Sequence, residues 1–536
     1  MKVSISKKHR LVFILFFLVS VPGLLCGASI HESLPAHTES RAMDPGLAES
    51  IESYSLEAME ELESPGLIVG IVDGNTLVFA GYYGYAEIES GRKVGKDTFF
   101  RIGSISKSVS TIGLLQQWEK DRFELDEDIN DYLPEPMIHP PHPETKPVTF
   151  RHLLTHTSGG GEFLSYEQLF HPNLGMQVEG YDYKPLEYYL RFGMETRVDP
   201  GLTYAYCNYG FGFLGLALEN MADTPFNEYM IENVFEPLGM DESTYHHDPA
   251  MMKRMAVGYR VGSDGEYEAT EHRAGGMTPA GNVYTTLEEF GLYVKALLNK
   301  GRNSHGRVIE PDTLEKMMKT HHSWDKRMRG YGFGLRIYGE DIWGHRVVGH
   351  SGSVPFGYTA QMLLVPDERV GVMVCSNSMT YSPKEIAWGV LKRYLGIKEP
   401  AFHPADPNTE VWPELTGFYG PRFHHLKLNF RLYMGGTGHY RVDTMDGRLV
   451  LIKTWQGRDQ ARRLFQVDPD DPYFYRLERK EDKEAPPRYV SFQKEGGEMY
   501  LVPGGYNRYV KLGPLRTVRA LFLTPGGRLI TEINPF

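Results

Sequence analysis

Cysteine is scarce in this chain, and its scarcity excludes a fold that depends on disulfide bonds. Three cysteines occur among 536 residues, and Cys26 lies in an N-terminal segment that we expect to be removed. Cys207 and Cys375 then remain, whereas small secreted domains built on disulfides carry a far higher density of cysteine. We therefore expect two free thiols.

Positive charge is also in the minority. The chain has 57 basic and 69 acidic residues, for a net charge of −12, and removal of the first 28 residues would take away four basic and no acidic side chains. The remaining chain would carry a net charge of −16 without a basic cluster. Binding to nucleic acid or to anionic lipid requires such a cluster, so we predict no nucleic-acid partner.

One long apolar run, residues 11–25, follows four basic residues and precedes Cys26 and two small residues. This order is typical of a secretory signal peptide, which we place at residues 1–28, and it predicts export to the periplasm or the exterior. An uncleaved membrane anchor is less favoured because the run is short and contains Pro22. Lipidation at Cys26 is the second alternative, since no small residue directly precedes that cysteine.

The length exceeds that of one ordinary domain. Strands at both ends of residues 45–396, with helices between them, predict an α+β unit in which an antiparallel sheet packs against an inserted helical part. Residues 397–413 are rich in proline and predict a linker. Short alternating strands between glycine-rich turns predict an all-β barrel over residues 414–536.

Several elements of the first unit are predicted from local pattern. Glycine-bearing or proline-bearing turns join two pairs of apolar β-branched runs, which indicates hairpins. Apolar residues at a helical period indicate helices. The predicted hairpins pair residues 66–72 with 76–80 and 358–365 with 370–375, and the predicted helices begin at about Ser104 and span 150–155 and 287–298.

Ser104 and Lys107 lie three residues apart where a strand gives way to the predicted helix. In the first turn of a helix, that spacing puts both side chains on one face. A neutral lysine amine could then take the proton of the serine hydroxyl and make it a nucleophile, provided that burial or nearby charge lowers the lysine pKa. The same spacing occurs at Ser4 and at Ser323, so the pattern needs support from its context.

Two later motifs supply that context. Tyr206 and Asn208 form a Tyr-x-Asn loop, in which the tyrosine can shuttle protons and the amide can hydrogen-bond both the substrate and the lysine. His350-Ser-Gly352-Ser353 precedes a predicted strand. Glycine at that position lets the chain approach a ligand closely, and the next backbone N–H can face an oxyanion.

Taken in order, the three motifs resemble those of the penicillin-recognising serine hydrolases, which include serine β-lactamases, low-molecular-weight penicillin-binding proteins, esterases and D-aminopeptidases. Further segments are similar to the AmpC-type branch, namely residues 148–159, Pro200-Gly201 and residues 331–335. The resemblance covers about residues 66–395.

The resemblance implies a role for each matching residue. Ser104 would be acylated, and Lys107 and Tyr206 would share proton transfer. Asn208 would orient the substrate amide, and the backbone N–H groups of Ser104 and Ser353 would form the oxyanion hole. It implies no metal and no other cofactor. The C-terminal barrel more vaguely resembles the lipocalin-like or barrel modules of some peptidases in this group.

His350 departs from the β-lactamase pattern, which has a lysine there to help hold the substrate carboxylate. Histidine is mostly neutral near pH 7, so the anchor weakens. We therefore expect an exported hydrolase of amide or peptide bonds and favour D-amino-acid substrates. The alternatives are a carboxylesterase or β-lactamase with the same site, or a non-catalytic protein that binds cell-wall peptide or penicillin. The oligomeric state stays open.

The remaining histidines suggest little chemistry. His152 and His156 lie four residues apart and could share a metal on a helix face, but no third ligand follows at a useful spacing, so we favour packing or capping. Three adjacent pairs are interpreted as surface residues. These pairs are His246-His247, His321-His322 and His424-His425.

Overall fold

A computed structural model describes residues 43–161, 177–262, 264–355, 357–379, 382–422, 439–455, 458–479 and 484–513. The predicted signal peptide, the alternative of lipidation at Cys26, and the pair His424-His425 lie outside the described residues. None of the helices within the described ranges combines the length and the apolar character needed to cross a membrane.

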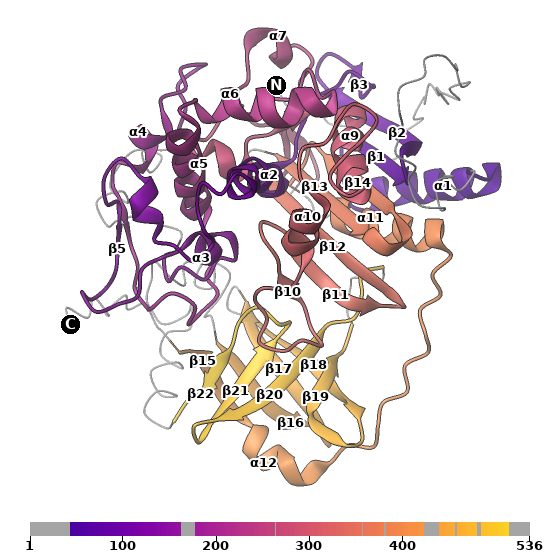
Figure 1. The fold of residues 1–536 in the computed structure, drawn as a ribbon. Coiled ribbons are helices and arrows are strands. Elements are labelled where there is room, and N and C mark those ends of the chain that lie inside the picture. Colours follow the sequence, from indigo (N-terminus) through magenta and orange to yellow (C-terminus); the bar gives the residue numbers. More distant parts are fainter. Residues whose placement is uncertain are drawn as a thin grey trace.

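An eight-stranded antiparallel sheet organises the first unit (Figure 1). Its strand order is β10-β11-β12-β13-β14-β1-β2-β3, so that strands from the start and the end of the unit pair in its interior. The edges come from distant parts of the sequence, as predicted, and both predicted hairpins are confirmed. The strands are β1 (Gly66–Asp73), β2 (Thr76–Glu87), β3 (Arg92–Lys93), β10 (Gly330–Tyr331), β11 (Arg336–Ile342), β12 (His345–Val354), β13 (Tyr358–Val365) and β14 (Val370–Ser376).

Strand β1 shows why the sheet is central. All eight of its residues are buried, because helices cover both faces. Leu67 and Val69 pack in one apolar cluster with α1 (Pro45–Glu61) and α11 (Ser382–Leu395), whereas Ile68 and Val72 belong to a second cluster with α2 (Ser106–Glu119) and α9 (Leu287–Leu298). This burial on both faces explains why the sequence of β1 is a continuous apolar run rather than an alternating one.

Helices form the rest of the unit. The predicted helix at Ser104 is confirmed, although its first turn is a 3₁₀ turn, Gly103–Ile105, and the α-helix begins at Ser106. The longer helices are α1 (Pro45–Glu61), α2 (Ser106–Glu119), α5 (Asn208–Ala222), α9 (Leu287–Leu298), α10 (Pro311–Met318) and α11 (Ser382–Leu395). The short helices are α3 (Phe150–Leu154), α4 (Leu186–Leu190), α6 (Phe226–Met230), α7 (Pro249–Met252) and α8 (Thr278–Gly281). Three small two-stranded sheets pair β4 (Phe100–Arg101) with β9 (Tyr284–Thr285), β5 (Ile138–His139) with β6 (Met194–Glu195), and β7 (Tyr259–Val261) with β8 (Tyr267–Ala269).

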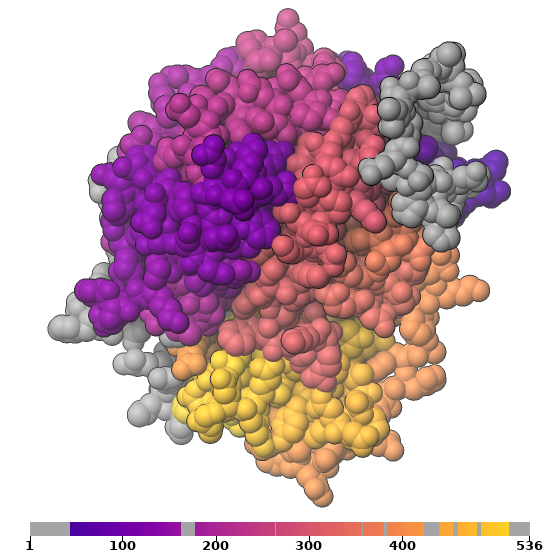
Figure 2. Space-filling model, in the orientation of Figure 1, coloured from indigo at the N-terminus to yellow at the C-terminus, as the bar shows by residue number. Residues whose placement is uncertain are grey.

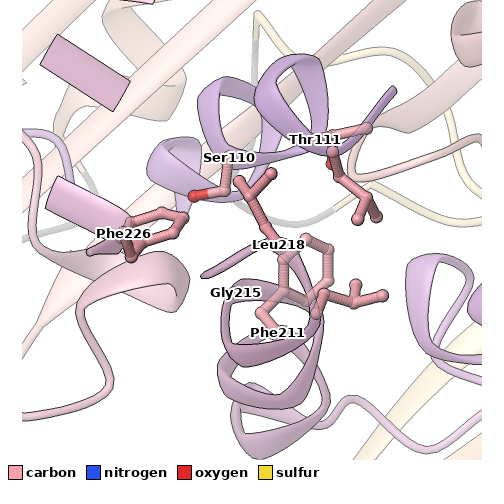
Figure 3. A pocket seen from close by; sticks show the side chains of 8 residues that line it. Ser110, Thr111, Phe211, Gly215, Leu218 and Phe226 are labelled. Atoms are coloured by element: carbon pink, nitrogen blue, oxygen red, sulfur yellow. The ribbon is translucent and has the colours of Figure 1, made fainter. Parts of the chain in front are cut away.

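Helices α2 and α5 pack against each other around a small enclosed gap (Figure 3). Ser110 and Thr111 reach it from α2, and Phe211, Gly215 and Leu218 reach it from α5. None of the residues predicted to carry chemistry lines this gap. It is therefore a feature of core packing and not a substrate site.

The predicted barrel is confirmed as a closed, eight-stranded antiparallel barrel, and an extended segment along the outside of the molecule joins it to α11 (Figure 1). Closure pairs the first strand with the last, Tyr419 opposite Lys511. A short helix, α12 (Trp412–Leu415), precedes it. The strands are β15 (Gly417–Pro421), β16 (Tyr440–Met445), β17 (Arg448–Trp455), β18 (Arg458–Asp468), β19 (Asp471–Leu477), β20 (Tyr489–Glu495), β21 (Glu498–Pro503) and β22 (Tyr509–Lys511).

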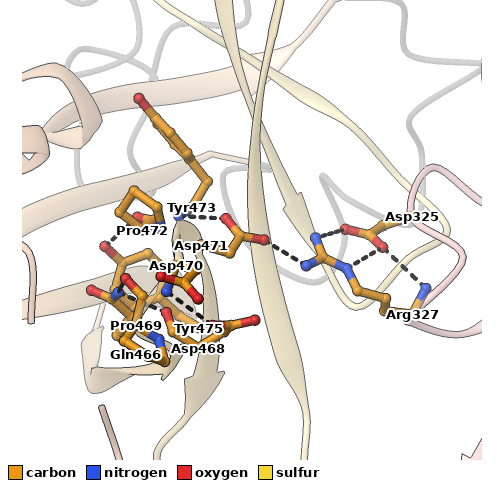
Figure 4. A network of polar contacts seen from close by, with 10 residues as sticks. All are labelled: Asp325, Arg327, Gln466, Asp468, Pro469, Asp470, Asp471, Pro472, Tyr473 and Tyr475. Carbon is orange, nitrogen blue, oxygen red and sulfur yellow. Dashed lines mark hydrogen bonds and ion pairs between the residues drawn. The ribbon is translucent and has the colours of Figure 1, made fainter. Parts of the chain in front are cut away.

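The barrel packs directly against the segment that leads into β10 (Figure 2). Met328 shares an apolar cluster with Phe474 and Val502 of the barrel. Beside this cluster Arg327 bridges the two parts, since its guanidinium donates to Asp325 at 2.8 Å and to Asp471 at 2.6 Å (Figure 4).

We expect Arg327→Ala to loosen this contact slightly at neutral pH. Arg327 is about half exposed, so the loss should be no more than about 1 kcal/mol. Burial raises the pKa of Asp325, but hydrogen bonds from the Arg327 side chain and backbone more than offset it, so the pKa lies below its usual range. A carboxylate with a depressed pKa stabilises the folded state above its unfolded pKa, and this contribution is lost as pH falls through the folded value.

Thermal unfolding of the wild type and Arg327→Ala should therefore differ at pH 7 and converge below about pH 4. Lys326→Ala, one residue away and exposed, is the control. A difference that grows as the pH falls would contradict this account.

The prediction that two further histidine pairs lie on the surface is wrong. His246 stacks on Tyr183 with 3.8 Å between ring centroids, and His247 is buried, so burial lowers the pKa of both imidazoles to about 4. His321 stacks on Phe333 at 3.7 Å. These contacts join residues that are 12 or more positions apart in the sequence, so the adjacency of two histidines gave no sign of them.

Candidate active site

Ser104 lies in a turn that is pressed against strand β12. Gly103 has a φ of 52°, in the left-handed region that favours glycine. A Cβ atom on Gly103 would lie 2.8 Å from the backbone nitrogen of Ser353, and one on Gly352 would lie 1.9 Å from the carbonyl oxygen of Ile102. The two glycines therefore permit a backbone approach that brings Ser104 beside the N–H of Ser353.

Lys107 is fully buried in the first turn of α2, and its amine lies among three oxygens. Nζ is 3.2 Å from Oγ of Ser104, 2.7 Å from Oδ1 of Asn208 and 2.6 Å from the carbonyl oxygen of Ala280. Asn208 and Ala280 can only accept at these atoms, so they take two N–H bonds. The lone pair of a neutral Lys107 amine would then face the Ser104 hydroxyl, as proton transfer from the serine to the lysine requires.

Tyr206 and Asn208 reach Lys107 from the start of helix α5. Nζ of Lys107 lies 4.9 Å from the centroid of the Tyr206 ring. Asn208 is the first residue of α5, and Cys207 is its N-cap, with an extended backbone. Sγ of Cys207 accepts from the N–H of Gly210 at 3.3 Å, which satisfies one of the unpaired amides at the helix start. Both Cys207 and Cys375 are buried free thiols, as expected.

A chain of hydrogen bonds connects the Tyr-x-Asn loop to strand β12. The N–H of Cys207 donates to Nδ1 of His156 at 3.1 Å, and Nε2 of His156 lies 3.0 Å from the Tyr331 hydroxyl. The same hydroxyl lies 2.8 Å from Nε2 of His350, whose Nδ1 is 2.7 Å from the carbonyl oxygen of Ser351. One proton arrangement satisfies all four bonds.

In that arrangement both histidines are neutral. Nδ1 of His156 accepts, so its Nε2–H donates to Tyr331, and the tyrosine hydroxyl donates to Nε2 of His350, whose Nδ1–H donates to Ser351. Burial, followed by the charges of Arg336 and Lys107, holds the pKa of His350 well below its usual value. The third motif therefore carries no positive charge at neutral pH.

Because the Tyr331 hydroxyl completes this chain, we expect Tyr331→Phe to lower the free energy of unfolding by about 1–3 kcal/mol, leaving two buried imidazole nitrogens without partners. Tyr293→Phe is a matched control, since the Tyr293 hydroxyl makes one buried hydrogen bond, to Ser108 at 2.9 Å. Thermal unfolding of both variants measures the difference. An equal loss in the two would show that the chain adds nothing beyond one hydrogen bond.

The structure brings most of the predicted site residues together. Lys107 contacts both Ser104 and Asn208, and Gly352 and Ser353 lie beside the Ser104 turn. His350 is fully buried, and its ring centroid is 6.4 Å from that of Tyr206. Sequence reasoning missed the linking roles of His156 and Tyr331, although both lie in segments that resemble the family.

The look-alike pair Ser323 and Lys326 and the suggested metal ligand His152 do not belong to this cluster. Ser323 does not contact Lys326 through its hydroxyl, which instead donates to the carbonyl oxygens of Asp325 and Arg329. His152 forms a capping box with Thr149, as the capping interpretation predicted. In the described part of the chain, no three His, Cys, Asp or Glu side chains are grouped so that they could hold a metal ion.

Comparison with known proteins agrees with this geometry. The Beta-lactamase family model matches residues 52–395. Penicillin-binding protein 4* of Bacillus subtilis is 23% identical over 400 residues, covering 69% of this chain and 84% of the relative. D-aminopeptidase of Gluconobacter oxydans is 27% identical over 362 residues, covering 66% of this chain and 62% of the relative.

Among solved structures, an octameric penicillin-binding protein homologue from Pyrococcus abyssi superposes with a TM-score of 0.58 at 25% identity. The match covers 88% of this chain and all of that one, so it extends beyond the sheet and helices into the barrel. The family match alone spans more than half of the chain. This protein therefore belongs to the beta-lactamase family and is a serine hydrolase.

Proposed function

We propose that this protein is an exported hydrolase that cleaves amide or peptide bonds, with D-amino-acid substrates favoured, through an acyl-enzyme on Ser104. Oγ of Ser104 would attack the carbonyl carbon while its proton passes to Nζ of Lys107. Tyr206 would carry a proton to the leaving amine, which departs as the C–N bond breaks. Water would then hydrolyse the acyl ester.

The contacts of the Lys107 amine carry this proposal. Asn208 and Ala280 accept two N–H bonds and orient the nitrogen toward Ser104 at 3.2 Å. A neutral amine so held has its lone pair directed at the serine proton, which is the arrangement that a general base needs. The N–H groups of Ser104 and Ser353 would stabilise the oxyanion, since the backbone of Ser353 lies beside the Ser104 turn.

The neutral His350 favours peptide or ester substrates over β-lactams. A substrate carboxylate placed at the third motif would meet no cation there, because burial holds the pKa of His350 low. One relative also supports a peptide substrate, since it is named as a D-aminopeptidase. A carboxylesterase or a β-lactamase using the same residues is the runner-up.

A fluorophosphonate probe tests the acyl-enzyme. We expect stoichiometric labelling of the wild type and none of Ser104→Ala, whereas Ser323→Ala, which removes the look-alike serine, should label normally. No labelling of the wild type would favour the non-catalytic binding protein, whereas labelling that survives Ser104→Ala would refute Ser104 as the nucleophile. Hydrolysis of a panel of D-amino-acid amides, short acyl esters and a chromogenic cephalosporin then ranks the substrate classes.

A further inference from the structure

His156 lies at a backbone position where glycine is usual. Thr155 is the C-cap of helix α3, and a Schellman motif closes the helix after it. In this motif the N–H of His156 donates to the carbonyl of Leu153 at 3.3 Å, and the next N–H along the chain donates to that of His152 at 2.8 Å. His156 has a φ of 58°, in the left-handed region that is unfavourable for a residue with a Cβ atom. Strained backbone persists only where the surrounding structure holds it, and it gathers at functional sites.

The segment that carries Tyr206 holds His156 in this conformation. The His156 carbonyl accepts the N–H of Ala205 at 2.8 Å, and Nδ1 of its imidazole accepts the N–H of Cys207 at 3.1 Å. One residue therefore binds the amides on either side of Tyr206. The imidazole also packs on the Tyr206 ring, with 4.2 Å between the ring centroids. Because His156 is fully buried, all three contacts form away from water.

The hydroxyl of Tyr331 fixes the proton on the other side of the imidazole. Nδ1 of His156 can accept from Cys207 only if the ring proton is on Nε2, and Nε2 lies 3.0 Å from the Tyr331 hydroxyl. That hydroxyl in turn lies 2.8 Å from Nε2 of His350. The chain therefore keeps His156 in the tautomer that binds the Tyr206 segment, and it joins the second motif to the third.

The position of Tyr206 is critical for the proposed chemistry. Its ring centroid lies 4.9 Å from Nζ of Lys107, so the two groups that would share proton transfer are neighbours. A displacement of about 1 Å in a group of this kind can lower the rate by about 10²-fold. A residue that holds the backbone and the ring of Tyr206 at once is therefore placed to control proton delivery.

We propose that His156 is a positioning residue, which holds Tyr206 where it can protonate the leaving group. The inference rests on the proposed function and deepens it, because it assigns the buried chain to one step. In that step Oγ of Ser104 bonds to the carbonyl carbon, and the bond from this carbon to the leaving group breaks. Tyr206 gives its proton to the departing atom and regains one from Lys107, which has taken the serine proton.

Two butyrate esters separate positioning from folding. They form the same acyl-enzyme, but p-nitrophenolate departs readily as an anion, whereas the more basic phenolate depends on a proton donor. We expect His156→Ala to lower kcat/KM for phenyl butyrate by about 10²-fold, at the low end of the range for general acid catalysis, and that for p-nitrophenyl butyrate by no more than about threefold. A mere loss of folded protein would lower both values by the same factor.

Further variants test whether His156 acts through Tyr206. Tyr206→Phe should show the same selective loss, and the double variant should lose no more than Tyr206→Phe alone, because the two residues are coupled. His156→Asn should recover about tenfold of the loss, since asparagine tolerates a positive φ and its Oδ1 can accept in place of Nδ1. His247→Asn is the matched control. It removes a buried imidazole that bonds to the Tyr183 hydroxyl, and it should leave the ratio of the two esters unchanged.

The outcomes distinguish this proposal from the proposed function. Equal losses for the two esters in His156→Ala, or additive losses in the double variant, would overturn the positioning role. So would a wild type that cleaves p-nitrophenyl butyrate but not phenyl butyrate. If thermal unfolding shows that His156→Ala is not folded, Tyr331→Phe gives a second variant, because it releases the Nε2 proton of His156 and should show a weaker loss of the same selectivity. No turnover of p-nitrophenyl butyrate by the wild type would refute the proposed function instead.

Discussion

Ser104→Ala is expected to lower kcat/KM for a reactive acyl ester by about 10⁴-fold or more, because loss of a nucleophile in serine hydrolases removes the covalent pathway. The pre-steady-state burst should vanish with it. The side chain is small and partly exposed, so the substitution should leave thermal unfolding almost unchanged. Stopped-flow measurement of the p-nitrophenolate burst, with active sites counted in the wild type, provides the comparison.

Ser323→Ala is the matched control for this experiment. Ser323 stands at the same spacing from Lys326 as Ser104 does from Lys107, but its hydroxyl bonds to the carbonyls of Asp325 and Arg329 at the barrel contact. It should retain the full burst. A burst that persists in Ser104→Ala would place the nucleophile elsewhere.

Lys107→Met should reduce the acylation rate by about 10³-fold, near the middle of the range for removal of a general base. Methionine has a similar length, but it supplies no proton acceptor for the serine hydroxyl. It also leaves Oδ1 of Asn208 and the carbonyl of Ala280 without a donor, so some stability should be lost as well. The burst rate, corrected for the folded fraction by thermal unfolding, isolates the effect on chemistry.

Chemical rescue distinguishes proton transfer from packing. Methylamine added to Lys107→Met should restore part of the rate, with a pH dependence that follows the free amine. Lys326→Met, which replaces the lysine of the look-alike pair, should behave as the wild type. A rate that falls in Lys107→Met only as far as its stability does, with no rescue, would assign the lysine a purely structural role.

Local patterns were sufficient for much of the fold. The turn at Gly74 and the β-branched runs around it gave the first hairpin, and the helical period gave α9 with its observed bounds. Ser104 and Lys107 were found because the pair lies within one helical turn. Asn208 was found because it follows Tyr206 at a fixed spacing, and the structure places it as the first residue of α5.

Contacts between distant segments were beyond the sequence pattern. The role of His156 depends on Tyr331, which meets it only when β10 joins the edge of the sheet. The burial of His247 likewise depends on a tyrosine-rich cluster assembled from separate loops. An arginine such as Arg336 looks like any other strand residue until the structure shows that its Nε is buried without a hydrogen-bond partner among the described residues.

The stacking of Tyr506 on Tyr204 has a consequence for how the protein is made. Protein synthesis proceeds from the N-terminus, and folding follows it in the same direction. The sheet, the helices and every residue of the Ser104 cluster thus leave the ribosome before Tyr506 does. Until the barrel docks, Tyr204 lacks one of its two stacking partners, Tyr506, and Nε2 of His322 lacks the carbonyl of Tyr506. The contact between Tyr204 and the barrel is therefore among the last to form.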